Sequence, residues 1–424
     1  MTQELKIWRA GFLVWAAMTL SFMAGMSIGS GLFTLATLFY FYRHREAMST
    51  MRNRTFFIAC LAFLGAALLS VLAAVISPPL GLPLENFGSL QKFHFFLLPF
   101  FACAALTATS PKNMGLEKHP LWTVLFYTAL FVSLIGIVQF WGASLFPASW
   151  VDDRFFRVIA TGEEPRRYHA QGLMYFHLSF ASALGFSCSW FGARLIWPPA
   201  GESTKTKFAW AAVTLITFLA LFFTYSRIAW IALGCILVTL AFLKKPKWGL
   251  LCALVIIGVS TVAWYTSDSL RGRWRLGMNS IFERQEVWSG ALGMVKDRPF
   301  TGVGFGKTGY YSRPYEIQVL GHEPQFSSHA HNNFLDMLAA MGFPGLAAFL
   351  AWWFVLGLFA WRSFRDALPG EHWIPAGCLA GLVAFQINGL TQVNYFDAKS
   401  EHALMLWAGV ILALEWRRRA RRES

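Results

Sequence analysis

Charged side chains are scarce in this chain of 424 residues, of which Asp, Glu, Lys and Arg make up only 14%. Soluble domains carry about 25% charged and about 45–50% apolar residues, whereas this sequence is 56% hydrophobic. The composition excludes a disordered or collagen-like chain and argues against an ordinary soluble enzyme. It predicts an all-α, polytopic integral membrane protein, because about 20 apolar residues in a helix cross a bilayer.

Cysteine and metal-binding patterns are also missing. The six cysteines all fall inside apolar stretches and none belongs to a Cys-x-x-Cys pair, which is typical of small buried side chains. The pair Asp152 and Asp153 lacks the Asp-x-Asp spacing of metal-dependent sugar transferases. A metal site built on His329, His331 and Glu323 lacks a further Cys/His pair to complete it. We therefore expect no metal and no cofactor.

Apolar runs long enough to span a membrane recur along the chain, and we expect about twelve transmembrane helices. The first two are separated by a tight turn at residues 27–31. No clear Ala-x-Ala site follows the first run, so we interpret it as a retained helix and not a signal peptide. The expected spans are residues 10–26, 28–42, 55–77, 93–109, 120–142, 173–193, 208–225, 228–243, 249–266, 343–361, 373–390 and 402–416.

The basic residues are divided unevenly between the two sides of these spans. With the amino terminus in the cytoplasm, the cytoplasmic segments hold 21 Lys and Arg, whereas the short outer loops hold only Lys92, Arg227 and Lys399. This bias is the positive-inside pattern of membrane proteins, so we expect both termini in the cytoplasm. It accounts for most of the net charge of +14, and we expect no nucleic acid as a partner.

Two long outer segments, 143–172 and 267–332, hold most of the polar residues. We therefore expect three parts: residues 1–266 with nine spans and the first loop, residues 267–332 as a large helical loop with the catalytic residues, and residues 333–424 with three spans and a basic tail. Charged residues are nearly absent from the spans, which disfavours an ion-coupled transporter but leaves a channel or flippase open. Long loops are often functional, so the site is expected on the outer face.

Histidines are concentrated just before the tenth span, at His322, His329 and His331. They lead into an apolar helix with a bend expected at residues 342–345 (Gly-Phe-Pro-Gly). One interpretation is a solvated loop end, with Asn332 or Asn333 capping the helix. The other is a general base, because an imidazole near its normal pKa is suited to taking a proton from a sugar hydroxyl.

Two arginines are candidate anion ligands. Arg227 lies in a tight outer turn between two apolar helices, and Arg284 lies in an apparent helix at residues 282–288. Each also has a plainer interpretation: Arg227 as an interfacial side chain reaching the headgroups, and Arg284 as an ion-pair partner of Glu283. A guanidinium binds phosphate through paired, charge-assisted hydrogen bonds, so both arginines are suited to a phosphorylated substrate.

Further basic residues of the two long loops are candidate substrate-binding groups. Segment 166–172 leads directly into a span and can present Arg167 and His169 to the same site, and a second run holds Arg271, Arg273 and Arg275. Segment 299–307 (Pro-Phe-Thr-Gly-Val-Gly-Phe-Gly-Lys) resembles a phosphate-binding loop only weakly. We interpret it as a tight turn with close backbone approach.

Three ordered stretches resemble the O-antigen ligase family, within the wider group of O-antigen ligases, polymerases and protein O-oligosaccharyltransferases. The first is residues 225–230 (Tyr-Ser-Arg-Ile-Ala-Trp). The second runs from Arg284 and Trp288 through residues 297–306, and the third is residues 329–336 followed by 342–345. Together they cover the carboxyl-terminal half of the chain in the family's order.

The resemblance implies a twelve-helix enzyme of the bacterial inner membrane. It would transfer O-antigen from undecaprenyl diphosphate to the lipid A–core oligosaccharide at the periplasmic face, by an inverting, metal-independent mechanism. Carried onto this sequence, the essential residues are Arg227, Arg284 and His331, with His329 nearby. The alternatives are a protein O-oligosaccharyltransferase or polymerase using the same donor, or a non-enzymatic flippase or channel. The short tail after Trp416 favours the ligase.

Overall fold

The computed structural model describes residues 2–21, 23–45, 53–84, 86–109, 115–142, 156, 159, 168–267, 271, 279–395 and 397–423, and the elements of secondary structure in these residues are helices. Each of the twelve expected spans overlaps a helix. These helices are α1 (Gln3–Met18), α2 (Met23–Arg43), α3 (Arg54–Ile76), α4 (Leu98–Thr109) with the preceding 3-10 helix η3 (Gly88–Leu97), α5 (Leu121–Trp141), α6 (His177–Ile196), α7 (Thr204–Phe223), α8 (Arg227–Lys244), α9 (Pro246–Thr266), α13 (Asn333–Arg365), α14 (Trp373–Gly389) and α15 (Ala398–Glu423).

Eight helical segments of the described chain are long and apolar enough to cross a membrane, and α14 is a shorter apolar helix. The protein is therefore an all-α, multi-pass membrane protein, as the composition predicted. The exact number of twelve spans stays a prediction. The six cysteines are unpaired in the structure, and the four within α3, α4, α6 and α14 are buried, which fits their expected role as small core residues.

The turn between the first two helices lies near residue 20, so the turn expected at residues 27–31 was wrong. Helix α1 ends at Met18, whose carbonyl accepts from Ser21 N at 2.9 Å. Gly29 lies within α2 instead, where an added Cβ would be 3.2 Å from the Cα of Trp15. Gly29 thus allows two helices to pack closely, and the local sequence does not distinguish this role from that of a turn glycine.

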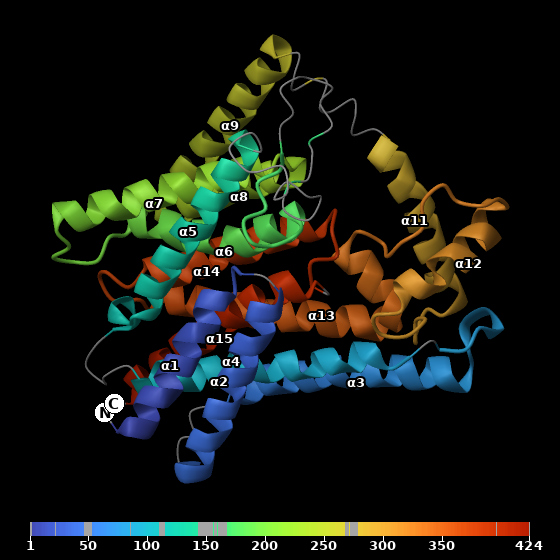
Figure 1. The fold of residues 1–424 in the computed structure, drawn as a ribbon, viewed down its shortest axis with the longest axis horizontal. Coiled ribbons are helices and arrows are strands. Elements are labelled where there is room, and N and C mark those ends of the chain that lie inside the picture. Colours follow the sequence, from blue (N-terminus) through green and yellow to red (C-terminus); the bar gives the residue numbers. More distant parts are fainter. Residues whose placement is uncertain are drawn as a thin grey trace.

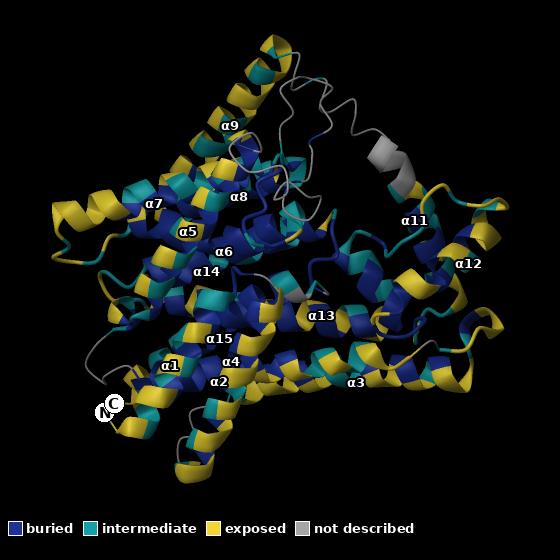
Figure 2. Ribbon diagram, viewed as in Figure 1, coloured by how far each residue is buried: buried dark blue, intermediate teal, exposed yellow. Residues whose placement is uncertain are grey.

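The two chain ends lie together at one end of the bundle, and two further helices, α11 (Asn279–Asp297) and α12 (Thr308–Leu320), lie at the opposite end (Figure 1). Helix α11 confirms the helix expected around Arg284, whereas α12 was not anticipated. Helix α6 is buried along nearly its whole length, while α9 is exposed on almost every side (Figure 2). The centre of the bundle is therefore α6, with α14 and α15 packed against it.

Helix α13 bends at Gly342, where φ is 67° and ψ is −170°. The bend expected from the Gly-Phe-Pro-Gly sequence is confirmed. At this bend the carbonyls of Ala339 and Ala340 lose their helical hydrogen bonds. The N–H of Phe343, which would bond to Ala339, donates to Pro299 instead, and Pro344 has no N–H to donate to Ala340. Buried carbonyls need other partners, so a second segment must supply them.

Segment 299–307 supplies those partners. The amide groups of Val303 and Gly304 donate to the two carbonyls at 3.0 and 2.9 Å, and Pro299 O accepts from Phe343 N at 2.8 Å. The tight turn with close backbone approach expected for this segment is confirmed. These bonds hold the segment between α11 and α12 against the bend of α13, and so fix the helix pair on the bundle.

Replacing Gly302 with alanine is expected to lower the free energy of unfolding by about 3 kcal/mol or more. Its φ is 65°, and a Cβ would lie 2.3 Å from the carbonyl of Ala340. Overpacking and left-handed strain each cost about 1–3 kcal/mol. Thermal unfolding in detergent measures the loss. Gly321→Ala is the control, because its φ is 75° with no atom within 4 Å; equal losses in both variants would remove the close contact as the cause.

Candidate active site

The start of α13 is tied to the segment between α14 and α15 by two asparagines. Asn332 caps the helix, its Oδ1 accepting from the amides of Phe334 and Leu335 at 2.9 and 3.0 Å. Asn333 donates to Asn394 Oδ1 at 2.6 Å. Of the two expected capping residues, Asn332 is therefore the cap. Asn333 instead holds the helix start against the last part of the chain.

The histidine loop is held in an unusual backbone conformation immediately before this cap. His331 has a φ of 46°, in the left-handed region that non-glycine residues rarely adopt. Trp288 on α11 donates its indole N–H to the carbonyl of Ala330 at 2.8 Å. The rings of His329 and His331 lie 4.5 Å apart between centroids. Two of the three sequence motifs thus meet at one place.

A cavity of about 550 Å³ opens beside His329. Its Nε2 is buried without a hydrogen-bond partner among the described residues, while Nδ1 lies 3.2 Å from Ser328 Oγ. The volume is typical of a small-molecule site. The ionisable and amide side chains of its lining come from α13, η3, α15 and the loops beside them; they are Lys92, His329, Asp336, Gln392, Asp397 and Lys399.

Asp336 is buried at the wall of this cavity and holds the histidine loop in place. Its Oδ1 accepts from the hydroxyl of Thr308 at 2.6 Å and from the amide of Ala330 at 3.4 Å. A carboxylate in the first turn of a helix is also favoured by the helix dipole. Asp336 therefore joins the start of α12, the histidine loop and α13, and it sets where His329 enters the cavity.

Two lysines of the cavity were not identified as site residues from the sequence. Lys92 lies on η3 and Lys399 on α15, and both line the cavity opposite acidic groups. They are two of the three basic residues expected on the short outer loops. The sequence does contain a signal for them. Basic residues are rare on the short outer loops, so the few that occur there are candidates for a site on the outer face.

The pKa of His331 is lowered to about 4, chiefly by burial and also by the charges of His329 and Arg284, against the opposing effect of a hydrogen bond to Gln392. The imidazole is therefore neutral near pH 7, with a lone pair available to accept a proton. Trp288, on the same helix as Arg284, donates to Ala330 between the two histidines. The structure thus packs the helix of Arg284 against the histidine loop, and the roles of these residues stay predictions.

Arg227 lies in a second polar group at the start of α8. His169 hydrogen bonds through Nδ1 to the carbonyl of Thr224 at 2.6 Å, in the turn that precedes Arg227, and its ring stacks on His177 at 3.9 Å. His169 is thus beside the turn that carries Arg227. Within the described chain, Arg227 is not among the residues that line the cavity.

Helix α6 connects this second group to the cavity. Phe176 and Ser179, on either side of His177 in the chain, both line the cavity, and the Ser179 hydroxyl donates to Asp397. The two polar groups therefore share the first turn of α6 as a common wall. This arrangement places the His169–Arg227 group next to the cavity without showing a direct contact between Arg227 and the histidine pair.

The other expected substrate-binding residues are only partly described. Arg271 donates to the carbonyls of Trp264 and Tyr265 at 3.2 and 2.8 Å, at the end of α9. Its role in substrate binding stays a prediction. Arg167, Arg273 and Arg275 lie outside the described residues. In the described part of the chain, no group of three His, Cys, Asp or Glu is arranged to hold a metal ion.

Comparison with known proteins identifies one family. Residues 212–350 match the model of the O-antigen ligase family. The matched region begins in α7 and ends in α13, so it includes Arg227, Arg284, His329 and His331 together with segment 299–307. No curated protein matches the chain.

Proposed function

Since residues 212–350 place this chain in the O-antigen ligase family, we propose that it transfers O-antigen from undecaprenyl diphosphate to the lipid A–core oligosaccharide at the periplasmic face of the inner membrane. The family is one of glycosyl-transferring membrane enzymes that act on lipid-linked glycans. The proposal adds the donor, the acceptor and the side of the membrane.

The observation that carries the proposal is the cavity beside the histidine pair. Its lining combines one imidazole, that of His329, with two lysines, Lys92 and Lys399. Arg284 acts electrostatically on the adjacent His331. A proton acceptor next to several cations is what a neutral hydroxyl nucleophile and a diphosphate leaving group require.

In the proposed reaction, an acceptor sugar hydroxyl attacks the anomeric carbon of the donor. A new glycosidic C–O bond forms as the bond from that carbon to the diphosphate breaks, with inversion. His331 accepts the hydroxyl proton, with His329 beside it as the alternative base. Undecaprenyl diphosphate departs with the electron pair, and Arg227 and Arg284 stabilise its developing negative charge.

Anchoring both substrates in one membrane contributes to the rate. A donor and an acceptor held by their lipids at the same depth lose much less orientational freedom on meeting than two molecules in solution. A site at the end of an apolar helix bundle suits such substrates, because the lipid chains can remain beside the helices while the head groups enter the cavity.

The decisive experiment uses purified protein with the lipid-linked glycan and the lipid A–core acceptor together. We expect a product that contains both the glycan and the acceptor, detected by gel shift and mass spectrometry, and no product when either substrate is omitted. Lengthened glycan from donor alone would assign the protein as a polymerase. Absence of transfer, together with movement of the donor across vesicle membranes, would assign it as a flippase.

A further inference from the structure

A second cavity lies at the opposite end of the bundle, near the two chain termini. It has a volume of about 400 Å³ and is formed where the ends of α13 and α15 come together. Four of its five lining residues are arginines, two from each helix: Arg362, Arg365, Asp366, Arg418 and Arg422. Since Asp366 is the single acidic residue of this lining, the cavity carries a formal charge of about +3.

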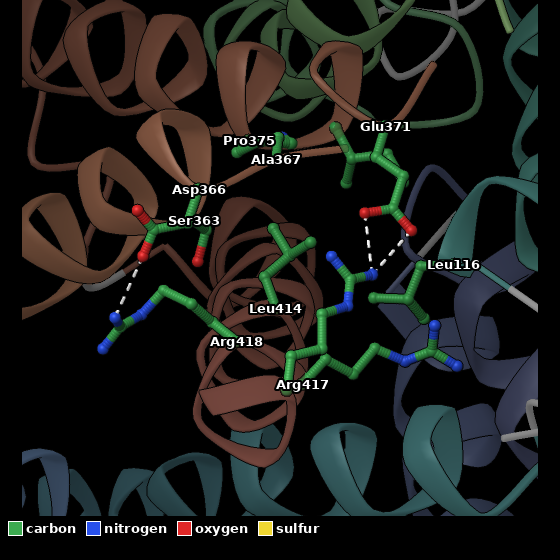
Figure 3. A pocket seen from close by; sticks show the side chains of 11 residues that line it. Leu116, Ser363, Asp366, Ala367, Glu371, Pro375, Leu414, Arg417 and Arg418 are labelled. Atoms are coloured by element: carbon green, nitrogen blue, oxygen red, sulfur yellow. Dashed lines mark hydrogen bonds and ion pairs between the residues drawn. The ribbon is translucent and has the colours of Figure 1, made fainter. Parts of the chain in front are cut away.

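In a neighbouring small cleft, arginines form ion pairs with acidic side chains (Figure 3). Arg421 binds both carboxylate oxygens of Glu371 at 2.8 Å. Arg418 binds Asp366 at 3.1 Å and Glu415 at 2.7 Å. The cleft between these pairs has a volume of only about 20 Å³. The paired side chains therefore leave little room for a bound anion.

The larger cavity differs because its charges are not balanced. Asp366 is already bound to Arg418 and Arg422, the latter at 2.6 Å. The guanidinium groups of Arg362 and Arg365 have no hydrogen bond or ion pair to any residue in the described ranges. Cations in the last turn of a helix are favourable in themselves, but two such helix ends converging on one open space make an anion site.

The exposed apolar side chains of α13 indicate which kind of molecule would carry the anion. Leu350, Phe354 and Trp361 are exposed to 46%, 70% and 42%, and with Arg365 they follow one face of the helix at spacings of four, seven and four residues. An acyl chain lying along this apolar stripe would end at Arg365. Arg365 is also the last residue of a segment long enough to span the bilayer, where lipid headgroups lie.

We propose that this cavity binds the phosphate group of an anionic phospholipid, with Arg362 and Arg365 as its principal ligands and an acyl chain along the α13 stripe. Guanidinium groups bind phosphate through paired hydrogen bonds, and basic pockets between transmembrane helices are suited to anionic lipid headgroups. The site is separate from the proposed catalytic cavity, so it stands whether or not the glycosyl transfer is confirmed.

Native mass spectrometry of the detergent-solubilised protein, titrated with phosphatidylglycerol or with phosphatidylcholine of the same acyl chains, tests the site. We expect phosphatidylglycerol to bind the wild type about tenfold more tightly or better, since each nearby arginine favours an anionic lipid. The double variant Arg362→Gln/Arg365→Gln should lose this preference. Lys245→Gln/Lys247→Gln removes the same charge where α8 passes into α9, and should keep the preference.

Two outcomes would overturn the proposal. Equal lipid preference in the wild type and Arg362→Gln/Arg365→Gln would show that the cavity is not the site. Displacement of phosphatidylglycerol by millimolar inorganic phosphate would assign the cavity to a soluble anion instead of a lipid. Because neither arginine side chain has a partner in the described structure, the double variant should elute from size exclusion and unfold thermally as the wild type does.

Discussion

Replacing His331 with alanine is expected to slow glycan transfer by about 10²–10⁴-fold, the usual contribution of a positioned general base. The ring of His331 lies 4.5 Å, between centroids, from that of His329, which lines the cavity. Removing its imidazole leaves the acceptor hydroxyl without a proton acceptor. The measurement is kcat with saturating donor and acceptor in the purified assay.

His322→Ala is the matched control, because His322 is an exposed histidine of the same segment that hydrogen bonds to the neighbouring carbonyl of Glu323 at 2.9 Å. It should transfer at the wild-type rate. His329→Ala is measured beside it, since His329 is the histidine of the pair that lines the cavity. A full loss in His329→Ala with little loss in His331→Ala would move the base to His329, and wild-type rates in both would remove the histidine mechanism.

The pH profile gives a second readout of the same assignment. The folded-state pKa of His331 is lowered to about 4 from an ordinary value of 6.5, so the base stays neutral as the pH falls through 6.5. The acid limb of kcat/KM should therefore lie well below pH 6.5, where protonation finally removes the lone pair. An acid limb centred at 6.5 would show that the base is not a buried imidazole beside Arg284.

Arg284→Lys and Arg227→Lys are each expected to lower kcat by about 10²–10³-fold, the loss typical of removing one group that stabilises transition-state charge. Lysine keeps the positive charge but not the planar pair of donors that fits a phosphate. Arg284 is the stronger case, because its charge already acts on His331 in the structure. Single-turnover transfer with preformed donor complex measures the chemical step.

Arg313→Lys is the control for both variants. Arg313 is an exposed arginine on α12 that pairs with Glu323 at 2.9 Å and is not among the residues that line the cavity. It should leave kcat unchanged. Wild-type activity in Arg227→Lys would remove Arg227 from the diphosphate site and leave it as an interfacial residue at the start of α8, whereas wild-type activity in Arg284→Lys would contradict the proposed stabilisation altogether.

Local features of the fold were predictable because they depend on residues close together in the chain. Apolar runs predicted the positions of the helices, Gly342 and Pro344 predicted the bend in α13, and the glycines of residues 299–307 predicted a close backbone approach. The same reasoning was wrong for residues 27–31. A glycine that permits a turn also permits close helix packing, and the choice depends on a partner helix.

The motif residues of the candidate site were predictable from the sequence, but the other residues that line the cavity were not. Arg284, His329 and His331 belong to segments with recognisable sequence, and the structure brings them together. Lys92, Gln392 and Lys399 come from single positions in unrelated segments, and no local pattern connects them. Only the packing of η3, α13 and α15 places their side chains around one space.

By itself the sequence determined that this is an all-α membrane protein, which motifs it contains and in what order, because hydrophobic runs and short spacings act through neighbouring residues. Tertiary structure alone decided which of those groups share a cavity, and that the guanidinium groups of Arg362 and Arg365 on α13 lack a partner among the described residues. These depend on contacts between residues tens to hundreds of positions apart, for which the energy comes from packing the whole bundle and not from any one segment.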